Sequence, residues 1–174
     1  MCGETSEAEA IREREAARVV LLDDEDRVLL IEGHDPARPA HGWYWFTIGG
    51  GLDRGETAIE AAIRETREET GLTLTREQLG PIIHEDAVEF VFEQETIRQR
   101  QAFFIVRVAP FEPDRAGWLS HETRTQRGMR WWSLSELRAT AATVYPDDLA
   151  DLVERWLPGF ESPESTARPE RSSM

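Results

Sequence analysis

The stretch that most constrains the fold of this chain is residues 50–72, GGLDRGETAIEAAIRETREETGL, a glycine-rich loop that leads into one helix. Thr57 followed three residues later by Glu60 is a capping-box pattern, in which each side chain bonds the backbone N–H of the other residue. Gly71 is typical of a helix end, because glycine readily takes the left-handed C-cap conformation. We therefore predict a helix over residues 58–70.

One side of this predicted helix carries three carboxylates. At 100° per residue, Glu65, Glu68 and Glu69 lie together at positions i, i+3 and i+4. The neighbouring face is expected to pack on a core and contains Ile59, Ala62, Ile63, Thr66 and Thr70. Like charges at i, i+4 destabilise an isolated helix by roughly 0.2–0.5 kcal/mol, and the helix dipole disfavours negative charge in the last turns. A hard divalent cation reverses this penalty, whereas the alternative is a solvated acidic face paired with Arg64 and Arg67.

The same stretch resembles the signature of the Nudix hydrolase family, G-x5-E-x7-R-E-U-x-E-E-x-G-U, in which U is a bulky apolar residue. The fixed positions of that signature are occupied in this chain by Gly50, Glu56, Arg64, Glu65, Glu68, Glu69, Gly71 and Leu72. One position departs, because Thr66 stands where the family has an apolar residue. Since Thr66 is expected to face the core, the departure concerns helix packing and not metal chemistry. A looser resemblance extends over residues 15–158.

The resemblance implies hydrolysis of a nucleoside diphosphate linked to another group X, by attack of water at phosphorus. The positions that match the family's metal ligands are Glu65, Glu68, Glu69 and the backbone carbonyl of Gly49. Arg64 matches the arginine that orients the glutamates. Glu56 matches a glutamate that supports the metal ligands without binding the metal itself. The implied cofactor is Mg²⁺, for which Mn²⁺ can substitute.

The general base is left open between the signature and a later loop, because the family uses either. Glu68 is the first choice. Glu122 is the second, in a polar loop over residues 110–127 that is long enough to have a function. Glu112, in the same loop, is a weaker third candidate. Both loop acids have a plain alternative as solvated surface carboxylates.

An aromatic run at residues 43–46 leads into the glycine loop. It is interpreted either as a buried strand or as a site where Trp43 or Trp45 stacks on a nucleobase, an interaction worth roughly 1–3 kcal/mol per base. Ile48 precedes the glycines where many relatives have proline, which predicts a less rigid entry. Downstream marks of several Nudix subfamilies are absent, so elimination favours a nucleoside triphosphate or a related small nucleotide as the substrate.

The remaining pattern predicts an α+β fold, an α/β/α sandwich with a mixed sheet between helices, as the resemblance also implies. Strands are expected at residues 16–22, 27–31, 43–46, 73–75, 82–92, 97–108 and 130–132, and further helices at 134–138 and 147–157. The predicted domain covers residues 15–160, between disordered tails at 1–14 and 161–174.

Composition excludes several classes of protein. The formal net charge of −14 argues against binding to a nucleic-acid duplex or an anionic membrane. All 20 basic residues are arginines, which excludes a P-loop lysine and Schiff-base catalysis. The single cysteine, Cys2, permits no intramolecular disulfide and favours a reducing, cytoplasmic location. The predicted partner is a small nucleotide, and a homodimer is compatible with the sequence.

Two alternatives to a Nudix hydrolase belong to other functional classes. One is a Nudix domain that binds a nucleotide as a sensor or interaction module without hydrolysing it. Such domains usually lose signature glutamates, and this chain retains them. The other is an isomerase of isoprenyl diphosphates, which in this family uses a cysteine in the core; Cys2 lies in the predicted tail.

Overall fold

The computed structural model describes residues 11–92, 94–114, 116, 118 and 122–157. Its strands are β1 (Arg12–Leu22), β2 (Val28–His34), β3 (Trp43–Gly51), β4 (His84–Phe92), β5 (Glu95–Arg107), β6 (Gln126–Trp132) and β7 (Thr143–Tyr145). Its α-helices are α1 (Ala58–Thr70), α2 (Arg76–Leu79), α3 (Glu122–Thr125), α4 (Leu134–Ala139) and α5 (Leu149–Trp156), and a 3-10 turn, η1, spans Pro39–His41. Within the described ranges, no helix has the length and apolar character needed to span a membrane.

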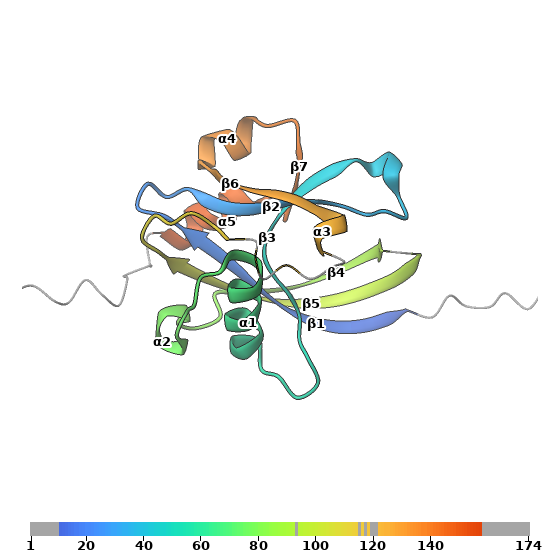
Figure 1. Cartoon of the computed structure of the whole chain (residues 1–174), viewed down its shortest axis with the longest axis horizontal. Coiled ribbons are helices and arrows are strands. Elements are labelled where there is room, and N and C mark those ends of the chain that lie inside the picture. Colours follow the sequence, from blue (N-terminus) through green and yellow to red (C-terminus); the bar gives the residue numbers. More distant parts are fainter. Residues whose placement is uncertain (1–10, 93, 115, 117, 119–121, 158–174) are drawn as a thin grey trace, which may run out of the picture.

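The strands form one mixed, curled sheet in the order β4-β5-β1-β2-β3-β7, with β6 added to β2 (Figure 1). The β1–β5 and β3–β7 pairs are parallel, and the other pairs are antiparallel. β3 first pairs with β2 and then crosses to β1, where Arg18 lies opposite Gly49. This crossing brings the glycine loop beside the middle of β1.

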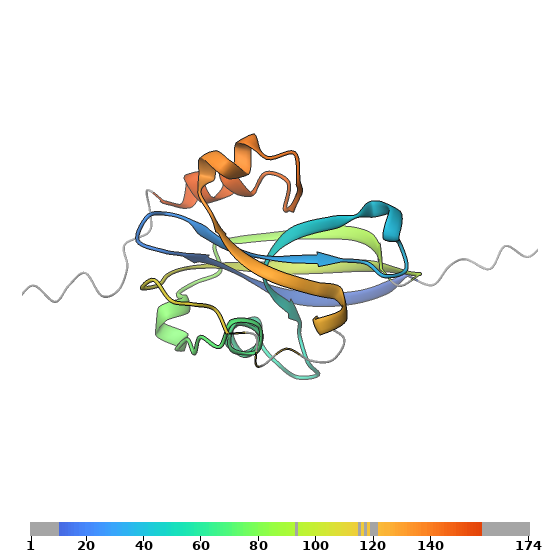
Figure 2. The same ribbon diagram turned by 45° about the horizontal axis from the view of Figure 1, so that its top comes forward.

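Each face of the sheet is covered by its own helices, as Figure 2 shows with α1 and α2 below and α4 and α5 above. Alternate residues of β1 enter the two cores: Val19 packs toward α1, and Val20 packs toward α5. Both side chains have 0% exposure, which explains why β1 reads as a continuous apolar run. The predicted α+β sandwich, with a mixed sheet between helices, is confirmed.

Several element bounds differ from the prediction. β1 begins at Arg12, so residues 12–14 belong to the sheet and not to a tail; residues 1–10 and 161–174 of the predicted tails lie outside the described part. Residues 73–75 form no strand, because Thr75 caps α2 in a capping box with Gln78. The strand β7 was not predicted, since three mostly exposed residues show no periodic pattern. Residues 43–46 lie in β3, as the strand interpretation expected, but they are not buried: Trp43 is exposed and the other three are half-buried.

Candidate active site

The helix α1 has the predicted ends. The Thr57 hydroxyl accepts a hydrogen bond from the Glu60 backbone N–H at 3.3 Å, and the Glu60 carboxylate accepts one from the Thr57 N–H at 2.8 Å. At the other end Gly71 has φ of +77° and donates to the Arg67 carbonyl. Both caps satisfy backbone groups that a helix leaves unpaired, so the two ends of α1 are set by its local sequence.

The packing of α1 buries two of its three predicted ligands. Glu65 is 9% exposed and Glu69 is 2% exposed, and both turn toward the sheet. The Glu68 side chain is 30% exposed. A solvated acidic face is therefore the wrong interpretation for Glu65 and Glu69. Burial of carboxylates is unfavourable unless each is paired, hydrogen-bonded or bound to a cation, which marks this side of α1 as a site.

The polar residue in the core face of α1 is accommodated by the helix itself. The Thr66 hydroxyl donates to the Ala62 carbonyl at 2.7 Å, and the Thr70 hydroxyl donates to the Thr66 carbonyl at 2.6 Å. Each buried hydroxyl thus has an acceptor one turn back. The departure of Thr66 from the apolar pattern leaves no unsatisfied group in the core.

The glycines at the end of β3 let the buried carboxylates reach the backbone. The Gly49 N–H donates to Glu69 Oε2 at 2.8 Å. A Cβ at Gly49 would lie 2.1 Å from the Ala17 carbonyl oxygen, and one at Gly50 would lie 2.5 Å from Glu65 Oε1. Gly49 also has φ of +125°, a conformation that favours glycine. The loop therefore has glycine where side chains would fill the space used by Glu65 and by β1.

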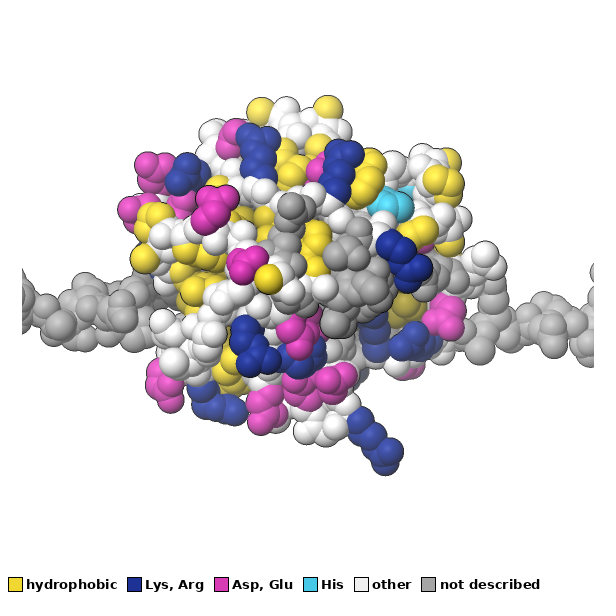
Figure 3. Space-filling view, viewed as in Figure 1, with side chains coloured by type: hydrophobic (Ala, Val, Ile, Leu, Met, Phe, Trp, Pro, Cys, Tyr) yellow, Lys and Arg dark blue, Asp and Glu magenta, His cyan; other side chains and the backbone are white. Residues whose placement is uncertain are grey.

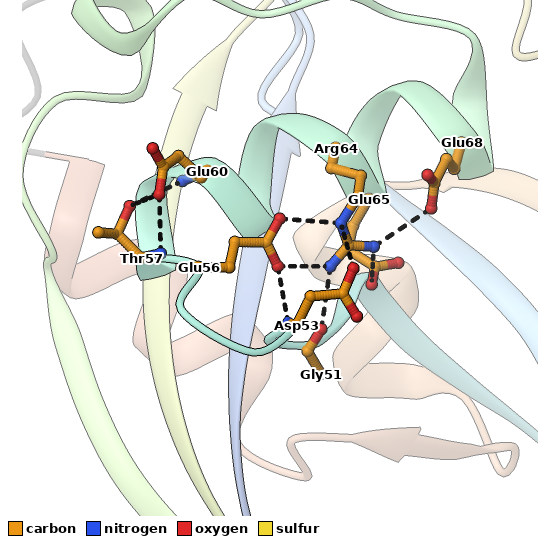
Figure 4. Close-up of polar contacts among 8 residues, drawn as sticks. All are labelled: Gly51, Asp53, Glu56, Thr57, Glu60, Arg64, Glu65 and Glu68. Carbon is orange, nitrogen blue, oxygen red and sulfur yellow. Dashed lines mark hydrogen bonds and ion pairs between the residues drawn. The ribbon is translucent and has the colours of Figure 1, made fainter.

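Arg64 gathers the acidic groups around its guanidinium (Figure 4). It donates to the Glu56 carboxylate at 2.9 and 2.8 Å, to Glu65 at 2.7 Å and to Glu68 at 3.2 Å. It also donates to the Gly51 carbonyl at 3.0 Å. These hydrogen bonds, led by the one to Glu56, raise the pKa of Arg64, and the Arg64 contact is the main cause that lowers the pKa of Glu56.

The surface over α1 and the preceding loop accordingly shows acidic and basic side chains intermixed (Figure 3). Glu56 is further held by the Asp53 N–H at 2.9 Å. The structure thus brings Glu56, Arg64, Glu65 and Glu68 into one contact group, with Glu69 beside it at Gly49. The spacing in the sequence predicted this group on one helix; the loop contacts complete it.

The donors in this group fit a hard divalent cation in chemical kind. Carboxylate oxygens and a backbone carbonyl are the ligands that Mg²⁺ and Mn²⁺ prefer. Among the described residues, no three Asp, Glu, His or Cys side chains close into a complete cage. Mg²⁺ does not require one, because it is usually held by one or two carboxylates together with water and substrate phosphates. The Gly49 carbonyl accepts a hydrogen bond from Arg18 Nη1 at 2.8 Å.

Two described residues of the segment after β5 contact the C-terminal end of α1. Trp118 Nε1 donates to the Glu69 carbonyl at 2.8 Å, and the Asp114 N–H donates to the Thr70 carbonyl at 2.9 Å. Glu122 is the first residue of α3, and its side chain lies outside the described part. Glu112 is exposed. Trp118 was not predicted to contact α1, although a tryptophan in a polar loop is a signal of packing.

The two tryptophans predicted to meet a nucleobase lie apart from the carboxylates. Trp45 packs edge-on against Trp132, with ring centroids 5.1 Å apart, in the core beneath α5. Trp43 is 37% exposed. The Arg127 guanidinium lies 4.1 Å from its ring centroid and the His34 ring 4.4 Å away. No contact in the described residues links either ring to α1, so their role in substrate binding stays a prediction.

The sequence of this chain matches a family model and several known proteins. The NUDIX domain pattern matches residues 12–154. The dihydroneopterin triphosphate diphosphatase of Escherichia coli (strain K12) is 35% identical over 72 residues, 41% of this chain and 45% of that protein. The RNA pyrophosphohydrolase of Sphingopyxis alaskensis is 30% identical over 134 residues, 71% of this chain and 80% of that protein.

Among solved structures, the MutT protein from Methanosarcina mazei Go1 has a TM-score of 0.60 and 19% identity, over 85% of this chain and 95% of that one. At this identity the likeness concerns the fold alone. This chain spans less than half the length of the first curated relatives that it matches.

Proposed function

Because this chain belongs to the Nudix hydrolase family, we propose that it is a Mg²⁺-dependent pyrophosphohydrolase of a nucleoside triphosphate or a related small nucleotide. Mn²⁺ substitutes for Mg²⁺. The observation that supports this most is the contact group on α1, where Arg64 binds Glu56, Glu65 and Glu68 while the glycine loop admits the buried carboxylates.

Each acidic residue has a distinct role in the proposed reaction. Glu65, Glu69 and the Gly49 carbonyl would hold the ion, with Glu68 beside them. A bound ion would lower the pKa of a water molecule that it holds and would neutralise charge on the phosphate oxygens. Arg64 fixes the carboxylates through its four ion pairs with acidic neighbours, Asp53 at 3.7 Å included.

Glu68 is the preferred general base. Its side chain is the most exposed of the three at 30%, and a base must reach a water molecule that enters from solvent. Arg64 Nη1 binds one of its oxygens at 3.2 Å, which orients the side chain. Glu122 remains the alternative base, since α3 follows the loop that Trp118 fastens to α1.

The substrate class is supported by two relatives. One is named a dihydroneopterin triphosphate diphosphatase and the other an RNA pyrophosphohydrolase, and both names describe hydrolysis of a phosphoanhydride. We extend that chemistry to this chain as part of the proposal. Trp43 is included as the candidate contact for a nucleobase because this residue is 37% exposed, whereas Trp45 packs against the core.

A nucleotide panel tests the proposal directly. Purified protein is incubated with nucleoside triphosphates, nucleoside diphosphate sugars and dinucleoside polyphosphates in Mg²⁺ or Mn²⁺, with added inorganic pyrophosphatase, and phosphate release is measured. Turnover of at least one nucleotide is expected. An absence of turnover across the panel, with tight nucleotide binding retained, would instead support a sensor function.

Replacement of Glu68 tests its role. Glu68→Gln is expected to lower kcat by about 10²-fold or more, the scale of lost acid–base catalysis, with an unchanged circular dichroism spectrum. The matched control is Glu77→Gln, which removes the same charge from an exposed position of α2 and should leave kcat unchanged. If Glu68→Gln stays within a few-fold of the control, the assigned role is wrong.

A further inference from the structure

Two arginines of β1 share the face of the strand opposite to Ala17. Arg14 and Arg18 are four residues apart, so strand alternation places them on the same face, and both are half-buried. Arg14 Nε donates to the Gln99 side-chain oxygen, and Arg18 Nε donates to Gln101 Oε1 at 3.0 Å. The two glutamines are buried, at 0% and 8% exposure, which fixes the positions of the guanidinium groups.

These two charges lack the acidic partners that neighbouring arginines have. Arg12 pairs with Glu95 at 3.0 Å and Arg98 pairs with Glu89 at 3.0 Å. In the part of the chain that the structure describes, no ion pair within 4 Å involves Arg14 or Arg18; their side chains bind amide and carbonyl oxygens instead.

The electrostatic environment reflects this arrangement. Burial, followed by the charge of Arg18, lowers the pKa of Arg14 to about 10. Burial also lowers the pKa of Arg18, and the carboxylates of Glu69 and Glu65 oppose that shift. A nearby anion would stabilise two half-buried cations that repel each other. Held by Gln99 and Gln101 and without an acidic partner among the described residues, the pair is suited to bind negative charge.

The arginine pair adjoins the carboxylate group of α1. Arg18 Nη1 donates to the Gly49 carbonyl at 2.8 Å, while the N–H of the same residue donates to Glu69 Oε2 at 2.8 Å. A single residue of the glycine loop thus joins the two groups. An anion bound near the Gly49 carbonyl would lie within reach of Arg18 from one side and of the α1 carboxylates, through a bound cation, from the other.

We propose that Arg14 and Arg18 form a phosphate-binding site for a part of the substrate beyond the anhydride held at α1. This inference rests on the proposed function and narrows it. A planar guanidinium binds two phosphate oxygens at once, and two of them on a rigid strand suit a chain of phosphates better than a neutral group X. The preferred substrate therefore carries three or more linked phosphates.

Direct binding of a phosphate chain tests this site apart from catalysis. The probe is inorganic tripolyphosphate, titrated calorimetrically into the protein in EDTA and, separately, in Ca²⁺. Arg14→Gln should weaken binding about tenfold or more in both buffers, because hydrogen bonds to charged groups are lost. The matched control is Arg12→Gln, the same charge change on the same strand at an exposed ion pair, which should shift binding by less than about twofold. Equal affinities of the two variants would overturn the inference.

Steady-state kinetics then separate this inference from the proposed function. With a nucleoside triphosphate, Arg14→Gln should raise KM about tenfold and leave kcat nearly unchanged, because the loss concerns binding more than the reacting bond. An inactive wild-type protein refutes the proposed function. An active wild type whose KM is unchanged by Arg14→Gln refutes only the arginine site. Should Arg14→Gln fail to fold, Arg14→Lys takes its place: it retains the charge without the bidentate geometry, and wild-type affinity in that variant would contradict the bidentate site.

Discussion

Replacing Arg64 by methionine removes the cation that gathers the acidic groups of α1 while keeping a long apolar stem. The change deletes hydrogen bonds to Glu56, Glu65 and Glu68 and to one carbonyl. The Arg64 side chain is 23% exposed, and those of Glu56 and Glu65 are 13% and 12% exposed. The group is therefore mostly withdrawn from water, though not fully buried.

The expected loss of stability follows from these exposures. Breaking a fully buried ion pair costs about 3–5 kcal/mol. The partial exposure of the Arg64 cluster reduces this to about 2–4 kcal/mol, even with the repulsion of roughly 0.2–0.5 kcal/mol between glutamates left facing each other. For a domain of this size that corresponds to a fall in Tm of about 5–15 °C.

Urea denaturation followed by circular dichroism measures the effect. Arg67→Met is the matched control, since Arg67 is exposed in the last turn of the same helix and should contribute less than about 1 kcal/mol. Added Mg²⁺ should restore a part of the stability lost in Arg64→Met, because a bound cation replaces the missing charge. A loss no larger than that of Arg67→Met would refute the assigned role of Arg64.

Three further outcomes follow from the glycine loop and from Glu56. Gly50→Ala should fold normally, because the added Cβ meets only the end of the Glu65 side chain at 2.5 Å, but it should weaken Mn²⁺ binding about tenfold by displacing that carboxylate. Gly49→Ala should lower the unfolding free energy by about 3 kcal/mol or more in thermal denaturation, because its Cβ would lie 2.1 Å from a backbone oxygen of β1 and its φ is +125°. The pKa of Glu56 lies below its ordinary value of 4.5, so its stabilisation is complete above that pH and is lost as the pH falls through the lower folded-state pKa. Glu56→Gln should therefore flatten the stability curve on its acid side, and an unchanged acid limb would contradict the contact.

The helix α1 could be predicted to the residue because the signals that fix it are local. Thr57, Glu60 and Gly71 form the caps without help from distant segments. α2 has the same kind of signal, Thr75 with Gln78, but Thr75 was predicted to belong to a strand. The capping residues near each helix are thus sufficient to locate the starts of α1 and α2.

The burial of the glutamates could not be read from helical periodicity. The apolar stripe placed Glu65 and Glu69 on a neighbouring face, yet both turn to the sheet because Gly49 and Gly50 leave room for carboxylates there. Arg18 was missed for a related reason. It meets Gly49 only through the register of β1 and β3, and register depends on the whole sheet.

Divalent-ion binding tests most directly whether the carboxylates of α1 form a metal site. Mn²⁺ is titrated into the metal-free protein, and the free ion is followed by electron paramagnetic resonance, with and without a nucleoside triphosphate. The wild-type protein should take up Mn²⁺ saturably, and more tightly with nucleotide, while Glu69→Gln should lose at least about tenfold in affinity. Wild-type protein that leaves all Mn²⁺ free under both conditions, or a Glu69→Gln variant that binds as tightly, would contradict the metal site and the hydrolysis assigned to it.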